Sequence, residues 1–306
     1  MDRDQHELQF LGFLGVYRET SKIILKWRKI FAEITLTLIL PLWIVFALSV
    51  FLQSLSFKTN WDNAWKFWSI ELGFFFFIFV FSQLLISAVV YTVACIYATK
   101  QITFKKIMSA WLRVWKRLMV TFLWCFALFF VYNVVAVGFL ILWLVILIKF
   151  PGVPALMIAL AVILLILYLV GLVYITMIWQ LASVISVLED AYGRKAMAKS
   201  KGLIKGKIGL WVWCFLGVLV CFVLVQALFG SLVVLLGVPI GVMIGVGLIC
   251  LMLLSMLVLF DLVMQTVIYF VCKSYHHENI DSACFSDHPE VCLGDRPSEG
   301  QNAFPA

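Results

Sequence analysis

The sequence predicts an all-α fold, a polytopic membrane bundle of six transmembrane helices in three hairpins with amphipathic cytoplasmic segments. Three observations predict it: an apolar composition, six long apolar stretches, and basic residues confined to alternate connections. Hydrophobic residues make up 64% of the 306 residues and charged residues only 13%, whereas about a quarter of the residues of a soluble domain are charged. The chain is therefore expected to be an integral membrane protein.

Six stretches meet the requirement of about 20 mostly apolar residues for crossing a hydrocarbon core of about 30 Å. They lie near residues 31–55, 70–97, 118–148, 153–187, 208–236 and 241–272. Turn residues at 149–152 (KFPG) and 237–240 (GVPI) divide two longer apolar runs into pairs, as Gly and Pro do at chain reversals. These two breaks raise the number of predicted spans from four to six.

Lysine and arginine are distributed unevenly between the two predicted sides of the membrane. The side with the N-terminal segment, the second and fourth loops and the tail holds 20 of the 23, and the other side holds 3. Because basic residues mark the cytoplasmic side, residues 1–30 are predicted to be a cytoplasmic amphipathic segment, 31–272 the transmembrane domain, and 273–306 a disordered cytoplasmic tail. The predicted location is the plasma membrane or an endomembrane.

Three basic clusters resemble one another and suggest an internal repeat. They begin at Ser21, Ser109 and Ser200, and each precedes a pair of predicted spans. A basic segment followed by a helical hairpin, present three times, accounts for this spacing. The alternative is that cytoplasmic loops attract lysine and arginine for orientation alone.

In the middle cluster, apolar residues such as Trp111 and Trp115 recur at three- and four-residue spacing with cations between them. This pattern is typical of a helix lying in the headgroup region. We therefore predict anionic lipid headgroups as partners, with protein partners or self-association also open and no nucleic acid. The predicted interface residues are Arg28, Lys29, Lys105, Lys106, Arg113, Lys116, Arg117, Lys199, Lys201, Lys205 and Lys207.

The connector between the fourth and fifth spans carries a motif. Its residues Glu189, Gly193, Ala196, Ser200 and Gly206 resemble the E-x-x-x-G-x-x-A-[LM]-x-x-S-x-x-L-x-[KR]-G connector in the membrane domain of some prokaryotic glycerophosphodiester phosphodiesterases. The whole chain, including its segment 11–31, is similar to a family of uncharacterised six-span plant membrane proteins. The resemblance implies a six-helix membrane bundle with no established chemistry.

Elementary chemistry offers a structural account of the motif. Gly193 suits a tight turn or a helix start, and Glu189 or Asp190 can accept hydrogen bonds from the free amides at that start. Ser200 can cap a helix or contact a neighbour.

Asp261 and Gln265 form the candidate intramembrane polar site. Asp261 lies about 12 residues, or roughly 18 Å, before Lys273, and so near the middle of the bilayer, where a carboxylate is costly and often functional. Gln265 follows on the same helical face, within reach of Asp261. One interpretation is a proton or solute site; the other is a neutral Asp that bonds to Gln226, Gln180 or Asn133.

The sequence shows no pattern typical of a catalytic, metal or cofactor site. The tail carries His and Cys residues, but their spacing matches no recognised zinc site. The leading prediction is a non-enzymatic membrane protein that scaffolds partners or organises lipid at the cytoplasmic leaflet. The alternative is a transporter or channel for a lipid or small solute that uses Asp261, and hydrolysis of a lipid phosphodiester rests on family analogy alone.

Overall fold

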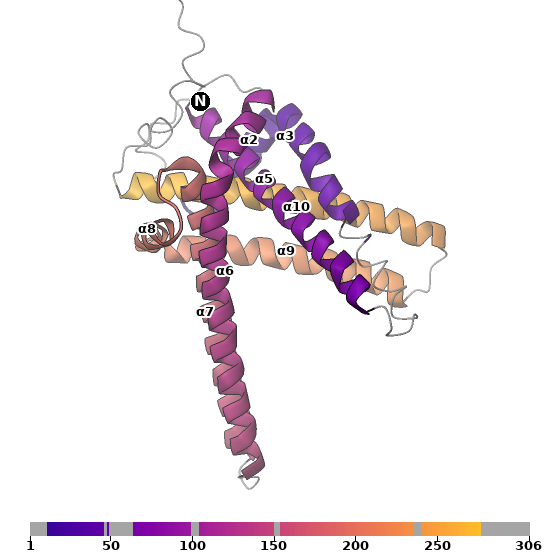
Figure 1. Cartoon of the computed structure of the whole chain (residues 1–306), viewed down its shortest axis with the longest axis vertical. Helices are drawn as coiled ribbons and strands as arrows, with labels where there is room; N and C mark the ends of the chain where they lie inside the picture. Colours follow the sequence, from indigo (N-terminus) through magenta and orange to yellow (C-terminus); the bar gives the residue numbers. More distant parts are fainter. Residues whose placement is uncertain are drawn as a thin grey trace, which may run out of the picture.

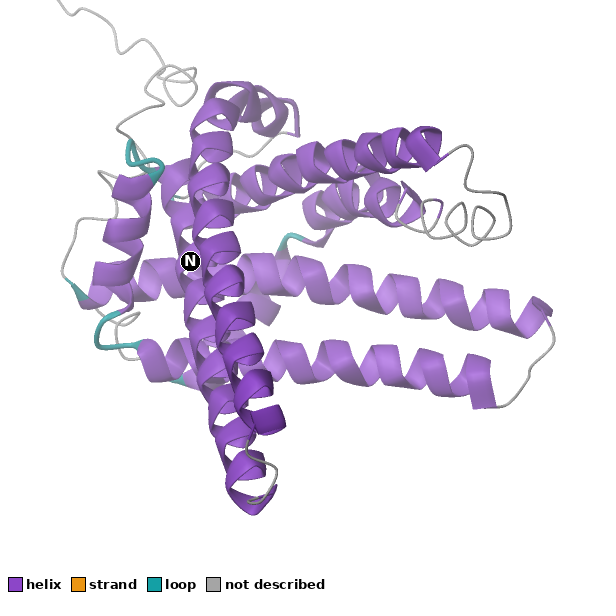
Figure 2. Cartoon of the chain, turned by 60° about the horizontal axis from the view of Figure 1, so that its bottom comes forward, coloured by secondary structure: helices purple, strands orange, loops and turns teal. Residues whose placement is uncertain are grey.

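The computed structural model describes residues 11–45, 48, 64–98, 104–149, 154–235 and 240–276, and this part of the chain is helical without any strand (Figures 1 and 2). The shorter elements are α2 (Phe13–Lys26), α3 (Arg28–Ile34), the π-helix η1 (Thr35–Ile39) and α8 (Arg194–Ile204). The long helices are α5 (Ala64–Tyr97), α6 (Phe104–Lys149), α7 (Pro154–Leu188), α9 (Ile208–Leu235) and α10 (Ile240–Tyr275).

Five helices are long and apolar enough to cross a membrane, which agrees with the predicted class of multi-pass membrane protein. The candidate spans are Leu72–Tyr97, Val114–Lys149, Leu156–Leu188, Ile208–Ser231 and Gly245–Tyr275. The first predicted span, residues 31–55, is helical through residue 45, and most of its remainder lies outside the described residues. Six spans in three hairpins, and the orientation of the termini, therefore stay predictions.

The helices α6 and α7 lie side by side, as do α9 and α10, and the two pairs cross steeply (Figure 1). Hydrogen bonds join α6 to α7: Tyr132 donates to the Tyr168 carbonyl at 2.8 Å, Tyr168 donates to Asn133 Oδ1 at 3.1 Å, and Trp143 donates to the Met157 carbonyl at 3.3 Å. Side-chain polar groups thus join α6 and α7 at the middle of the hairpin and near its Lys149/Pro154 end. Such bonds replace the hydrophobic drive that apolar helices lack in lipid.

The core of the molecule surrounds the C-terminal part of α10. Every residue from Leu262 to Ser274 is buried, because α2, α5, α7, α8 and α9 all pack against this helix. A helix that is apolar on all sides must be surrounded either by other parts of the protein or by lipid. The opposite part of α10 is different, with Leu248, Ile249 and Met252 exposed.

The basic segments pack parts of their apolar sides onto protein. In and beside the first basic cluster Ile23 and Phe31 are buried, as are Ala196, Ser200, Leu203 and Ile204 in and beside the third. The middle segment is continuous with its span in the 46 residues of α6, since no Gly or Pro interrupts the sequence where they meet. Interfacial amphipathic helices and the internal repeat remain predictions.

Candidate functional site at the α8 connector

Two glycines set the course of the connector, residues 189–207, between α7 and α9. Gly193 has φ 58° and Gly206 has φ 92°, values that side-chain-bearing residues rarely adopt. Neither position has room for a side chain. A Cβ on Gly193 would lie 3.2 Å from atoms of Trp124 and Val120, and a Cβ on Gly206 would lie 2.8 Å from the Tyr275 ring. The predicted turn at Gly193 is therefore present, and the bend at Gly206 brings the connector onto the end of α10.

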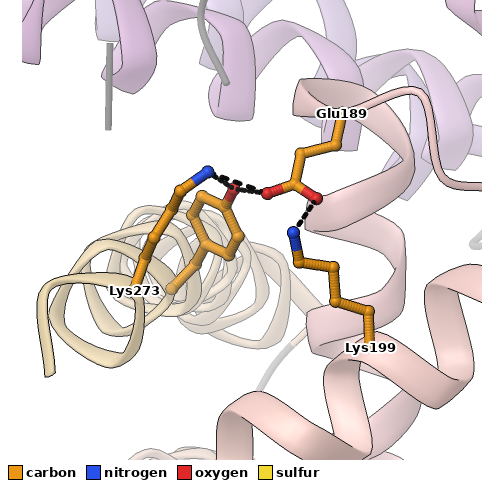
Figure 3. A network of polar contacts seen from close by, with 4 residues as sticks. Glu189, Lys199 and Lys273 are labelled. Atoms are coloured by element: carbon orange, nitrogen blue, oxygen red, sulfur yellow. Dashed lines mark hydrogen bonds and ion pairs between the residues drawn. The ribbon is translucent and has the colours of Figure 1, made fainter. Parts of the chain in front are cut away.

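Glu189 is the centre of a polar network (Figure 3). Its Oε1 accepts hydrogen bonds from Tyr269 Oη at 2.6 Å and from Lys273 Nζ at 2.9 Å, and its Oε2 lies 2.7 Å from Lys199 Nζ. The Lys273 side chain is only 4% exposed, whereas that of Lys199 is 33% exposed. We call these four residues, Glu189, Lys199, Tyr269 and Lys273, the Glu189 cluster.

The surroundings of Glu189 keep its carboxylate ionised. Burial opposes ionisation and by itself would raise the pKa of Glu189. Hydrogen bonds from Lys199, Tyr269 and Lys273, together with the charge of Lys273, outweigh burial, so that the pKa is lowered from its ordinary value. The cluster is thus a charged junction that holds α8 and the end of α7 to α10.

The expectation that Glu189 or Asp190 would cap the start of α8 is wrong. No side chain caps α8, because Glu189 bonds to the lysines and Tyr269, and Asp190 pairs with Arg117 at 2.7 Å. The backbone amide of Gly193 instead donates to Thr121 Oγ1 of α6 at 2.8 Å. The connector is therefore fixed to α6 as well as to α10.

Further contacts complete the junction. Arg194 lies over the Trp124 ring at 5.6 Å, and Lys207 lies over the Tyr275 ring at 5.0 Å, both within the range of cation–π attraction. Ser200 is fully buried and donates to the Met197 carbonyl at 2.9 Å. Each motif residue thus has a packing or charge role.

Sequence reasoning missed the partners of this motif. The prediction places Lys273 at the start of the tail, but this residue lies within α10, which continues to Tyr275. Tyr269 and Thr121 carried no signal, because their distance from Glu189 and Gly193 along the chain hides the contact. The sequence offered one indication that Lys273 belongs to α10: no turn residue separates this lysine from the apolar helix before it.

Asp261 and Gln265 contact each other as predicted, with Gln265 Nε2 donating to Asp261 Oδ2 at 2.5 Å. Of the other predicted partners, Asn133 bonds to Tyr168 and to the Phe129 carbonyl, Gln226 is exposed, and the buried Oε1 of Gln180 has no hydrogen-bond partner in the described part of the chain. Tyr17 of α2 lies nearby, since its ring centroid is 5.4 Å from that of Phe260. Burial, with smaller effects of Cys214, Cys221 and Asp261, raises the pKa of Tyr17 to about 12, so its hydroxyl remains a donor to the Cys214 carbonyl.

The predicted interface cations divide into several groups. Arg28, Lys29, Lys116, Lys201 and Lys205 are exposed, whereas Arg117 and Lys199 are held in ion pairs. The side chains of Lys105, Lys106 and Arg113 lie outside the described part. In the part of the chain that the structure describes, no group of three His, Cys, Asp or Glu side chains could hold a metal ion.

Comparison with known proteins identifies a family whose function is unknown. No curated protein and no solved structure matches the chain. One family model matches residues 1–65 and 53–298, which together cover most of the sequence. Its description names neither plants nor phosphodiesterases. The protein therefore belongs to the family described as Domain of unknown function (DUF8558).

Proposed function

We propose that this protein is a non-enzymatic multi-pass membrane protein that binds and organises anionic lipid, or scaffolds partners, at the cytoplasmic leaflet. The observation that supports it best is the rigid attachment of a basic connector. The Glu189 cluster and the Gly193–Thr121 bond fix α8 in place, and three other lysines of the connector are then presented outward.

Three of these lysines are suited to headgroup phosphate. Lys195, Lys201 and Lys205 are exposed, and no ion pair joins them to another described residue. Cations near an anionic membrane surface contribute about 1 kcal/mol each to lipid association. Because the backbone beneath them is fixed, their binding adds no cost for ordering the backbone, and only the lysine side chains lose conformational entropy.

The test measures lipid preference in proteoliposomes with spin-labelled phosphatidylserine and phosphatidylcholine. We expect the wild type to enrich phosphatidylserine and the triple variant Lys195→Gln/Lys201→Gln/Lys205→Gln to lose most of that preference. The matched control is Lys58→Gln/Lys66→Gln/Lys149→Gln, which removes three cations from the predicted opposite side. The proposal fails if the connector variant keeps the full preference and the wild type recruits no partner protein.

Transport through the helix bundle is the second candidate. The helices α5, α7 and α10 pack together, and each carries a polar side chain in its apolar length: Gln83, Gln180 and Asp261. In the described part of the chain, the buried Oε1 atoms of Gln83 and Gln180 have no hydrogen-bond partner. Unpaired polar atoms of this kind are costly and often mark a site for water or a ligand.

A further inference from the structure

We infer that the headgroup layer on the connector side meets the molecule where α2 contacts Gly217 and Phe260, and not at the ends of the helices. The connector side is the side that carries α8 and the C-terminal end of α10. The helix segments beyond this level would then form a core outside the hydrocarbon. This inference concerns the position of the membrane and rests on other residues than the proposed function. Under it, the α8 lysines act on anionic headgroups from the part of the molecule outside the hydrocarbon.

The first support comes from the charge on α2. Its Tyr17 donates to the Cys214 carbonyl at 3.1 Å and would touch any Cβ placed on Gly217. Val16, Thr20 and Ile23 are buried on the packed side of α2, while Arg18 and Lys22 are exposed on the opposite side and Lys26 is exposed at its edge. Exposed cations are strongly disfavoured in hydrocarbon, so this level of α9 and α10 lies in or outside the headgroup layer.

The exposed side of α2 also has the composition of an interfacial surface. Leu14 is 78% exposed and Leu25 is 71% exposed, and with Arg18 and Lys22 they follow one line at helical spacing. Apolar side chains that reach toward acyl chains beside cations that reach phosphate are typical of a helix in the interface. The opposite side of α2 is already packed on protein, so this line is the side available to lipid.

The second support is a change in burial along the long helices. The apolar residues of α5 from Leu84 to Ile96 are mostly buried, whereas Leu72, Phe75 and Phe76 are exposed. The same change occurs on α7, where Leu156–Val170 is largely exposed and Leu181–Leu188 is buried. Lipid permits exposed leucine and phenylalanine, while water requires that protein cover them. The covered segments therefore fit a position outside the hydrocarbon.

The helix lengths beyond this level agree with this position. Ile240–Phe260, Gly217–Leu235 and Pro154–Tyr174 each contain about 20 helical residues, or about 30 Å of helix, which is the thickness of the hydrocarbon core. Because the hairpins cross steeply in Figure 1, their helices must tilt relative to the membrane normal. A tilted helix needs more residues to cross the membrane, and α6 is long enough to supply them.

Exposed Trp and Tyr side chains occur on α6, α7 and α9 where the buried positions of each helix give way to exposed ones. Trp213 is 64% exposed, Trp124 is 46% exposed and Tyr174 is 36% exposed. On the α6/α7 hairpin, the stacked pair Tyr132 and Tyr168 fixes the register, which places Trp124 and Tyr174 at similar height. Trp and Tyr concentrate where hydrocarbon meets headgroups. Asp261, next to Phe260, would then lie at the boundary and not near mid-bilayer.

The test uses nitroxide labels on single cysteines in proteoliposomes of the full chain. The background carries Cys221→Ser, Cys284→Ser and Cys292→Ser, and its residual labelling is subtracted. Arg18→Cys and Trp213→Cys probe the proposed boundary, and Val223→Cys and Leu228→Cys probe the lipid-facing part of α9; all four positions are exposed. Power saturation compares collisions with oxygen, which concentrates in hydrocarbon, against collisions with a water-soluble nickel complex.

We expect nickel to relax the labels at 18 and 213 several-fold more efficiently than those at 223 and 228, which oxygen should relax instead. The rival position, with hydrocarbon beginning at Ile208, predicts oxygen-dominated relaxation at 213 and 18 as well, and that result would overturn the inference. An elution profile matching the wild type in detergent confirms the fold of each variant. All four substitutions replace exposed side chains, which keeps the core intact.

Discussion

At the scale of single residues, Glu189 is the most consequential side chain of the connector. One carboxylate neutralises Lys273, which is 4% exposed, and also holds Lys199 and Tyr269. A buried pair is weak evidence of net stabilisation, but removing one partner leaves a charge buried without compensation. When Glu189 is changed, Lys273 therefore loses the counter-charge of a buried cation, whereas Lys199 remains partly exposed to solvent.

We predict that Glu189→Gln destabilises the protein by about 3–5 kcal/mol, because Lys273 then loses its counter-charge inside the protein. Lys199→Gln is the control and should cost about 1 kcal/mol or less, because Lys199 belongs to a partly exposed pair. Equilibrium unfolding in mild detergent with a chemical denaturant measures both. Equal effects of the two substitutions would contradict the central role of Lys273, and Glu189→Gln/Lys273→Met should recover much of the loss.

The lowered pKa of Glu189 predicts a pH dependence with a definite sign. Its folded-state pKa lies below the ordinary value of 4.5, so its stabilising contribution is complete above that value and is lost as pH falls through the folded-state pKa. The difference in unfolding free energy between wild type and Glu189→Gln should be constant from neutral pH to about 5 and shrink below about 4.5. A difference that stays constant down to pH 3 would show that Glu189 does not act through its charge.

At the scale of elements, the connector depends on the conformation of Gly193. We predict that Gly193→Ala destabilises by about 1–3 kcal/mol, because φ is positive and the added Cβ would crowd Trp124 and Val120. Gly202→Ala is the matched control: it is helical and exposed within α8, and its Cβ would meet nothing within 4 Å. That change should stabilise by about 0.5–1 kcal/mol.

The same unfolding measurement compares these two alanine variants in one detergent. If Gly193→Ala kept wild-type stability, the turn would not depend on a left-handed backbone. If Gly202→Ala were as harmful as Gly193→Ala, the effect would belong to α8 as a whole and not to its entry.

Elements differ in how well sequence predicts them. Long apolar runs between turn residues predicted α5, α6, α7, α9 and α10, because length and apolarity are local properties. The site could be predicted only in part: Glu189 and Gly193 were singled out, but Tyr269, Lys273 and Thr121 were not. Their contacts join distant segments, and one sequence contains no record of which segments meet. The prediction starts the third span at residue 118, after the cations, and so misses the extension of α6 through its basic segment. Lysine and arginine are good helix formers, so the helix continues through them.

At the scale of the whole molecule, the helices share a covered core on the connector side and separate toward the other side. Lys273, Tyr269 and Gln265 all lie on the buried part of α10. This arrangement lets changes at the connector reach α10 directly, through the Glu189 cluster. It also distinguishes the two candidate functions, because lipid organisation uses the outside of this core while transport requires a path through it.

The substitution Asp261→Asn tests which of these applies. An amide at this position can keep a hydrogen bond with Gln265 while removing the carboxylate's charge, so a packing role predicts wild-type or higher stability. A packing role also predicts that vesicles loaded with a pH-sensitive dye show the same low proton leak whether they contain the wild type, Asp261→Asn or no protein. Gln265→Leu serves as the control that removes the hydrogen bond but keeps the carboxylate. A proton flux present in wild type, lost in Asp261→Asn and accompanied by an intact fold would favour transport, with the basic connector then serving to anchor the bundle.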